Sequence, residues 1–318
     1  MIILLALLVV AAVLLPHVVP LRRVAPATAA TLWGVALGLR ALTSVFVALY
    51  LVLFLPATAL FDAMTHWCWH TIIPIATTHL GVAGHRVGDA VAIFPIFLLA
   101  ASAISLTFGL VRAARSVRRL ITRDAVGRGP ADSVIVGGPD VFVAAAGFSN
   151  PRLVVSAGAL TQLDDEELAA GIDHEHGHIR RRHRFVVLYA EACRALARFI
   201  PGTKHAVSQL RFHLERDADA WALARQHDRF ALASAICKAT ISQNPAVAPL
   251  GGGRDVRDRV DELLSGHRTP GALRRSALNT TAALGVVLLL GLTASVPSVI
   301  AAGQQQANGA PVPHACDG

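Results

Sequence analysis

The stretch DDEELAAGIDHEHGHIR, residues 164–180, decides how the middle of the chain folds. Asp164 and Glu167 stand three residues apart, which is the spacing of a capping box, in which each side chain binds a free backbone amide at a helix start. The intervening acidic residues favour the positive end of the helix dipole. We therefore expect a helix that begins here and continues through the pentapeptide HEHGH at residues 174–178.

Two histidines of this pentapeptide, His174 and His178, are four residues apart, so on a helix they share one face. Two imidazoles at that separation can bind one Zn²⁺, which accepts tetrahedral nitrogen and oxygen ligands. Glu175 can take a proton from a water whose pKa zinc lowers toward about 7, and the hydroxide can then attack a peptide carbonyl. The pattern predicts a zinc peptidase site with Glu175 as the catalytic base. A histidine-rich surface helix is the alternative interpretation.

A catalytic zinc site needs a third protein ligand and leaves its fourth position to water. Glu215 and Asp219 are four residues apart in a second predicted helix and share a face. This spacing makes Glu215 a candidate ligand and Asp219 a candidate hydrogen-bond acceptor for a ligating imidazole. A solvated acidic face paired with neighbouring arginines would explain the same two residues. His213 is a weaker competitor, and His183 stands at the wrong spacing from the pentapeptide.

Four long apolar stretches indicate a membrane protein. The chain has 318 residues, of which 54% are hydrophobic, and a soluble domain of this length is rarely so apolar. The stretches cover residues 2–19, 32–55, 90–111 and 281–302. Each approaches the roughly 20 residues that a helix needs to cross a bilayer core. A buried core helix would explain any one of them, but not all four together.

The basic residues predict the orientation of these spans. The segment 112–280 holds 25 of the 29 Lys and Arg residues and 18 of the 21 Asp and Glu residues, which gives it +7 of the net charge of +8. Because positive charge collects on cytoplasmic loops, we expect this segment in the cytoplasm, against anionic lipid, and both termini outside. Residues 1–111 then form a membrane region and residues 303–318 a short extracytoplasmic tail. In a membrane protein this charge gives no reason to expect nucleic-acid binding.

The cytoplasmic segment is expected to open with β-strands and to continue with helices. Residues 133–136, 141–145 and 153–156 are rich in β-forming residues and are separated by Gly, Pro, Asn and Asp. Further helices are expected near 206–225 and 256–264. The predicted fold is a multi-pass α-helical membrane protein with an α+β, zincin-like cytoplasmic metalloprotease domain.

Together these features resemble a known group of membrane zinc peptidases. The HExxH helix, the later ExxxD helix, the β-rich lead-in and the position between the third and fourth spans are similar to those of the beta-lactam sensor and antirepressor metallopeptidases. The phrases VVSAGAL at 154–160 and LDDEEL at 163–168 resemble the related CAAX-prenyl-protease and heat-shock membrane proteases. The resemblance implies that Glu215 is the third ligand, that a lead-in strand binds the substrate backbone, and that the substrate is a cytoplasmic DNA-binding repressor.

The chain departs from that group at three points. Asp173 and His176 occupy positions that are usually apolar, which makes the local packing an open question. Only about 16 residues follow the fourth span, so no penicillin-binding sensor is present in this sequence, and direct sensing of a beta-lactam is not expected. The alternatives to repressor cleavage are a quality-control protease for membrane proteins and a non-catalytic signalling scaffold. Nothing in the sequence sets the oligomeric state.

Two features of the predicted outer side remain open. Cys68 and Cys316 both fall where oxidation is possible, so a disulfide between them is a hypothesis and two free thiols are the alternative. The segment HWCWH at 66–70 fits an interfacial aromatic belt better than a metal or ligand sensor.

Overall fold

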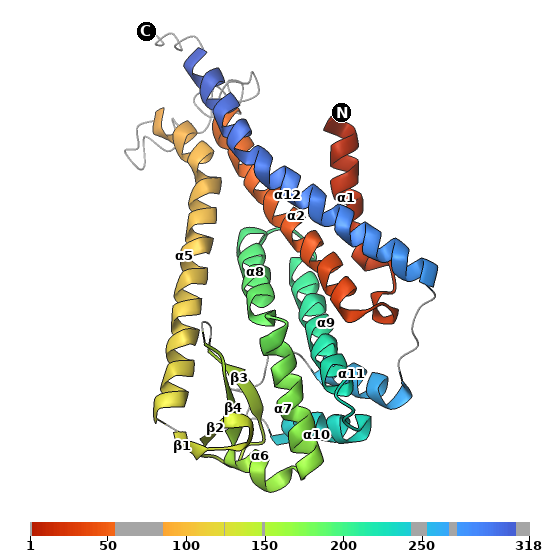
Figure 1. Cartoon of the computed structure of the whole chain (residues 1–318). Coiled ribbons are helices and arrows are strands. Elements are labelled where there is room, and N and C mark those ends of the chain that lie inside the picture. Colours follow the sequence, from red (N-terminus) through yellow and green to blue (C-terminus); the bar gives the residue numbers. More distant parts are fainter. Residues whose placement is uncertain are drawn as a thin grey trace.

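The computed structural model describes residues 2–54, 85–123, 125–147, 150–242, 253–266 and 272–309 (Figure 1). Long helices project from one end, and a small sheet lies with shorter helices at the other (Figure 1). The helices of four residues or more are α1 (Ile2–Val18), α2 (Pro26–Leu53), α5 (His85–Arg123), α6 (Ala157–Gln162), α7 (Asp165–Arg180), α8 (His183–Leu196), α9 (Thr203–Leu223), α10 (Arg229–Ser242), α11 (Gly253–Ser265) and α12 (Ala272–Gly309). The strands are β1 (Ala125–Arg128), β2 (Val134–Val136), β3 (Val143–Ala146) and β4 (Arg152–Ser156).

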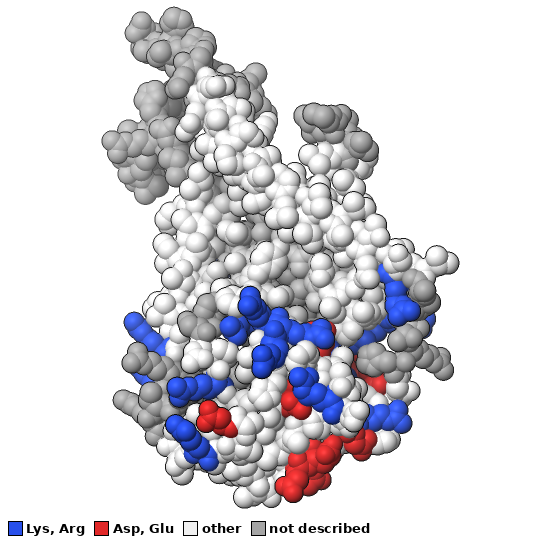
Figure 2. All heavy atoms as spheres, viewed as in Figure 1, with Lys and Arg blue, Asp and Glu red and all other residues white. Residues whose placement is uncertain are grey.

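Three helices of the described chain are long and apolar enough to cross a membrane: Pro26–Leu53, Ile96–Ser116 within α5 and Arg275–Gln305 within α12. They correspond to three of the four predicted spans. The first predicted span forms α1, but its apolar helical part, Leu5–Val18, is shorter than the others. The prediction of four spans is therefore supported at three positions only. In the view of Figure 2 the charged side chains gather over the half of the molecule that holds the sheet and α7, whereas the described surface of the other half shows none.

The sheet has the strand order β1-β2-β4-β3, with β2 parallel to β4 and the other pairs antiparallel. The three predicted strands are confirmed with shifts of one or two residues at their ends. Strand β1 was not predicted, because the sequence AVGR is fully exposed and has no apolar alternation. Strand β3 lies at one edge, where it pairs only with β4 among the described residues. Its other side has no strand partner in the described part of the chain, and an edge of this kind can accept an added strand.

The largest hydrophobic core joins α2 to α8, α9 and α12. Trp33 and Leu37 on α2 are buried in one cluster with Cys193 on α8, Leu210 on α9 and Leu278 on α12. Gly38 permits this contact, since a Cβ atom there would lie 2.1 Å from the Tyr189 hydroxyl oxygen. The N-terminal half of an apolar, membrane-length helix is consequently part of the same core as α8 and α9.

Candidate metal centre

Helix α7 carries the HEHGH pentapeptide, as predicted. Its capping box is confirmed: the Glu167 amide donates to Asp164 Oδ1 at 2.8 Å, and the Asp164 amide donates to Glu167 Oε2 at 2.9 Å. These bonds satisfy two backbone amides that the helix itself leaves free. The cap sets where α7 begins and therefore which face His174 and His178 share.

A glycine brings α7 close to α9. A Cβ atom on Gly177 would lie 3.0 Å from Trp221 Cβ and Cγ, which is closer than almost any real contact of this kind. Any larger residue would push the two helices apart. The glycine between the two predicted ligand histidines thus allows α9 to present its own side chains to them.

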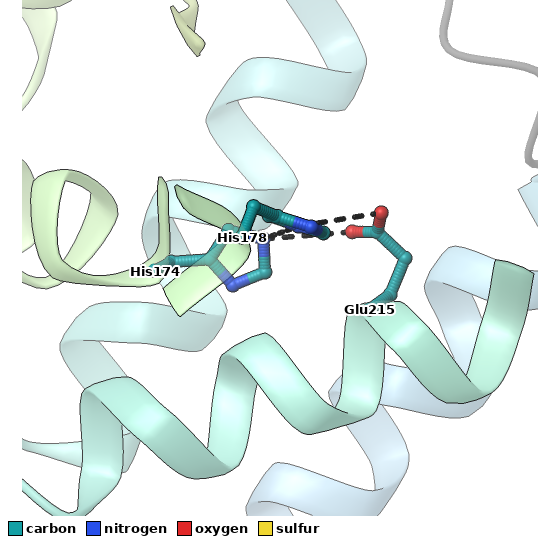
Figure 3. Close-up of side chains that lie close together, drawn as sticks. All are labelled: His174, His178 and Glu215. Atoms are coloured by element: carbon teal, nitrogen blue, oxygen red, sulfur yellow. Dashed lines mark hydrogen bonds and ion pairs between the residues drawn. The ribbon is translucent and has the colours of Figure 1, made fainter. Parts of the chain in front are cut away.

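Figure 3 shows His174 and His178 of α7 turned toward Glu215 of α9. His174 Nε2 lies 3.3 Å from His178 Nε2 and 3.5 Å from Glu215 Oε2, and His178 Nε2 lies 3.6 Å from Glu215 Oε1. One ligand atom from each residue lies within 4.8 Å of the other two. Two imidazole nitrogens and a carboxylate oxygen form a donor set typical of zinc.

The second nitrogen of each histidine also has a polar neighbour. His174 Nδ1 lies 2.9 Å from Asp219 Oδ1, which is an ion-pair distance without the geometry of a hydrogen bond, so the structure brings Asp219 to His174. His178 Nδ1 lies 2.9 Å from His183 Nδ1, and His183 Nε2 lies 3.1 Å from Asp217 Oδ2. Such contacts fix the orientation of an imidazole and the nitrogen that is free to bind a metal. The role of His183 and Asp217 was not found from the sequence.

Arg259 of α11 is a further residue that sequence reasoning missed. Its guanidinium donates to Glu215 Oε2 at 2.9 Å and to both Asp219 oxygens at 2.9 and 2.7 Å. Burial alone would raise the pKa of both carboxyl groups. The Arg259 charge and the histidines outweigh burial, so the pKa of Glu215 falls well below its ordinary value and that of Asp219 falls to about 2. Both groups are therefore carboxylates at neutral pH.

The charge at the cluster suits a cation. Burial lowers the pKa of His174, but the contacts with Asp219 and Glu215 outweigh it and raise the pKa to about 10. The carboxylates that favour a proton on this imidazole would also favour a divalent cation between the three ligand atoms. The residues present therefore fit a zinc ion in both chemistry and charge.

Glu175 reaches the sheet. Its Oε2 accepts a hydrogen bond of 2.8 Å from the backbone amide of Ala145. Ala145 belongs to the edge strand β3, where it pairs with Leu153 of β4. The predicted catalytic base is thus held at the open edge of the sheet, next to the histidine cluster.

The other residues named from the sequence lie elsewhere. His213 is fully buried, with its Nδ1 3.1 Å from Arg216 Nη1 and outside the histidine cluster. Asp173 and His176, whose packing was an open question, have polar partners. Asp173 Oδ2 lies 2.7 Å from His227 Nε2, and His176 Nδ1 lies 3.4 Å from Asp173 Oδ1. Asp173 thus contacts the loop that follows α9, and His176 contacts Asp173 within α7, so polar contacts stand at both positions.

The proposed disulfide and the outer-loop segment cannot be placed. Cys68, Cys316 and residues 66–70 lie outside the described residues. Within the described chain, Cys193 and Cys237 are free cysteines.

Comparison with known proteins identifies the class of the domain. Residues 112–267 match the model of Peptidase family M48. The chain therefore carries an M48 metallopeptidase domain, and this domain includes the β-rich lead-in, α7, α9 and α11. No curated protein and no solved structure matches the chain.

Proposed function

We propose that this protein is a membrane-embedded zinc endopeptidase that cleaves a protein at the cytoplasmic face of the membrane. The observation that carries the proposal is the meeting of His174, His178 and Glu215 within 3.3–3.6 Å inside an M48 domain. These three residues would hold the ion, and Glu175 would be the catalytic base. The four-span arrangement, with both termini outside, is part of the proposal and rests on the distribution of basic residues.

The residues around the ion have separate tasks. When bound, zinc would polarise the peptide carbonyl and make water acidic enough to deprotonate near neutral pH. Glu175 accepts the proton of the attacking water and can pass it to the leaving amine. Asp219 and His183 orient the two imidazoles, and Arg259 holds Glu215 ionised.

Strand β3 supplies a place for the substrate backbone. An extended peptide can add to an open sheet edge through main-chain hydrogen bonds. The bond between Ala145 and Glu175 fixes the distance between this edge and the catalytic base. A peptide lying along β3 would therefore present a carbonyl beside Glu175. This geometry supports an endopeptidase, because the chain passes the site without requiring a free end.

The proposed substrate is a small DNA-binding repressor whose cleavage changes transcription. This part of the proposal rests on the resemblance to the antirepressor peptidases. The excess positive charge of residues 112–280 favours an acidic or membrane-adjacent partner. A quality-control peptidase and a non-catalytic scaffold are the competing functions, and the experiment below separates them.

The decisive experiment compares three single variants of the full chain in detergent. Glu175→Ala should keep about one zinc ion per chain and lose peptide cleavage by orders of magnitude, because it removes the base and no ligand. His174→Ala should lose both zinc and cleavage. His176→Ala is the matched control, since His176 stands on the same helix but contacts Asp173 and not the cluster, and it should keep both. Zinc is measured by mass spectrometry and cleavage with quenched fluorescent peptides.

The same variants distinguish the functions in cells. If Glu175→Ala reproduces the transcriptional change of a deletion strain, repressor cleavage is supported. If it behaves like wild type while the deletion does not, the scaffold function is correct. If transcription is unaffected but fragments of membrane proteins disappear, the quality-control function is correct. Full cleavage activity in purified Glu175→Ala protein would contradict the proposed mechanism.

A further inference from the structure

Arg40 of α2 is buried, and no acidic residue of the described ranges contacts it. Arg40 is 3% exposed, and its Nη1 donates weakly, at 3.3 Å, to the Ala36 carbonyl one turn earlier on its own helix. Its Nη2 lies 3.4 Å from His17 Nε2, and its Nε has no partner. No Asp or Glu of the described ranges forms an ion pair with it. A buried charge without a counter-charge is unfavourable, so an anion from outside the chain would stabilise it.

Two further basic side chains lie at the same place. His17 of α1, Trp33 of α2 and His205 of α9 form a triangle with ring centroids 4.9–5.6 Å apart. Both histidines are exposed, whereas Arg40 is buried. The three positive or ionisable groups therefore form a site with an accessible rim and a buried cation at its base.

The N-terminus of α9 completes the surroundings. Gly202 is its N-cap, no side chain caps this end, and its first turn has no acidic residue. A Cβ atom on Gly202 would lie 3.4 Å from Arg40 Nη2 and 3.5 Å from His17 Nε2. The start of a 21-residue helix thus lies beside the buried guanidinium, although its first amide, that of Thr203, donates to the Ile200 carbonyl at 3.4 Å. The positive end of a helix dipole and an arginine together are a favourable environment for phosphate.

The neighbouring surface is apolar. Val18 is 81% exposed on α1, and Phe199, in the turn between α8 and α9, is 73% exposed. A cavity of about 290 Å³ between α2 and α5 is also lined by the turn, through Phe199 and Ile200. Its α2 residues Thr43, Ser44 and Val47 follow Arg40 along one face of that helix. A ligand with an anionic head and an apolar chain matches this arrangement, in which an apolar surface lies next to the basic side chains.

From this arrangement we propose that Arg40, His17, His205 and the N-terminus of α9 bind the phosphate of an anionic phospholipid. The acyl chain would lie along the apolar face of α2 and the turn between α8 and α9. The lipid would supply the counter-charge that the described part of the chain does not supply to Arg40. This site is separate from the histidine cluster of α7, and the proposal does not depend on peptidase activity.

The test uses the full chain, purified in detergent and stripped of lipid. Thermal unfolding is followed while phosphatidylglycerol, phosphatidylcholine or inorganic phosphate is added, and native mass spectrometry records retained lipid. Phosphatidylglycerol should stabilise the wild-type protein more than the other two. Arg40→Gln should weaken its binding by about tenfold or more, because it removes charge-assisted hydrogen bonds to phosphate.

Two other variants make the result specific. His205→Glu places a negative charge at the exposed rim of the site and should also abolish the preference for phosphatidylglycerol. Arg257→Gln removes one positive charge from α11, where the side chain is 83% exposed, and should leave the preference unchanged. Without lipid, Arg40→Gln should be at least as stable as wild type, since the arginine is then uncompensated.

Three results would overturn the proposal. Equal stabilisation of wild type and both site variants by phosphatidylglycerol would show that the lipid binds elsewhere. The full effect from inorganic phosphate alone would show a site for the free anion and not for a lipid. If Arg40→Gln is less stable than wild type without lipid and still binds phosphatidylglycerol as tightly when the lipid is added, Arg40 has a structural role only.

Discussion

Arg259 and Arg40 are both buried, but the chain compensates their charges differently. Arg259 is 8% exposed and contacts two carboxylates, Glu215 and Asp219. Arg40 is 3% exposed and contacts a backbone carbonyl and a histidine. At the metal cluster the opposite charges are assembled before any ligand arrives, which favours a preorganised catalytic site. At α2 the positive charge of Arg40 has no opposite charge among the described residues, and this favours the binding of an anionic ligand.

The largest effect should come from removing Arg259. Arg259→Met leaves Glu215 and Asp219 without their cation, and breaking a buried ion pair in this way costs about 3–5 kcal/mol. We expect that loss of unfolding free energy in chelator-treated protein. Saturating zinc should make the loss smaller, because the ion would replace part of the missing positive charge. Denaturant unfolding with and without zinc measures both values.

Arg257→Met provides the control for this comparison, because it alters the same helix at an exposed position. It should change stability by less than about 0.5 kcal/mol. An equal loss in the two variants would mean that α11 is sensitive to substitution in general. The charge balance at Glu215 would then not explain the effect.

A smaller effect is expected at the contact between the cluster and the sheet. Ala145→Pro removes the amide that donates to Glu175, and proline is tolerated on an edge strand where the amide faces outward. A hydrogen bond to a charged group contributes about 1.5–3 kcal/mol, so kcat/KM should fall by roughly tenfold or more while zinc content is unchanged. Ala145→Val keeps the amide and should keep the activity. If the Pro variant is as active as the Val variant, the hydrogen bond from β3 to Glu175 does not contribute to catalysis.

The smallest effect concerns Glu167, a buried charge that is balanced within the chain. Burial raises its pKa, but hydrogen bonds from Lys238 and Ser234 outweigh burial and lower it. A carboxyl group whose folded pKa is lowered adds stability above its unfolded pKa and loses it as pH falls through the folded value. Glu167→Gln should therefore destabilise the protein by roughly 1 kcal/mol at pH 7, and by progressively less below about pH 4.5. Unfolding of chelator-treated protein across this range tests the sign, and a difference that grows on acidification would contradict it.

The sequence predicted those parts of the site that depend on local spacing. The capping box and helix α7 follow from residues three and four apart, and the face shared by His174 and His178 follows from helical geometry. The same rule proposed Glu215 and Asp219 as a pair on one helix. Such predictions succeed because α7 and α9 are ordinary helices whose periodicity is visible in the chain.

The rest depends on how distant segments pack. Arg259 lies 44 residues after Glu215, and nothing in the run RDVRDRVDE predicts which arginine faces a carboxylate. The contact of Glu175 with Ala145 spans 30 residues and requires the position of an edge strand. Arg40 lies within the apolar stretch 32–55, and its burial beside α1 and α9 cannot be inferred from hydropathy. The first apolar stretch does form a helix of 17 residues, α1, but apolar composition alone does not decide whether so short a helix crosses a membrane or packs against its neighbours.

The shared core of α2, α8, α9 and α12 has a consequence for the order of events during synthesis. The peptidase residues are translated after α2 and before α12, yet both flanking helices contribute side chains to the core beneath α9. A nascent chain that has emerged only as far as α11 lacks Leu278 and Ala282, so the core on which α9 packs is incomplete. The packing of α9, which carries Glu215, would then be complete only after α12 has folded against α2. The metal cluster would therefore be among the last parts of the described fold to reach its final geometry.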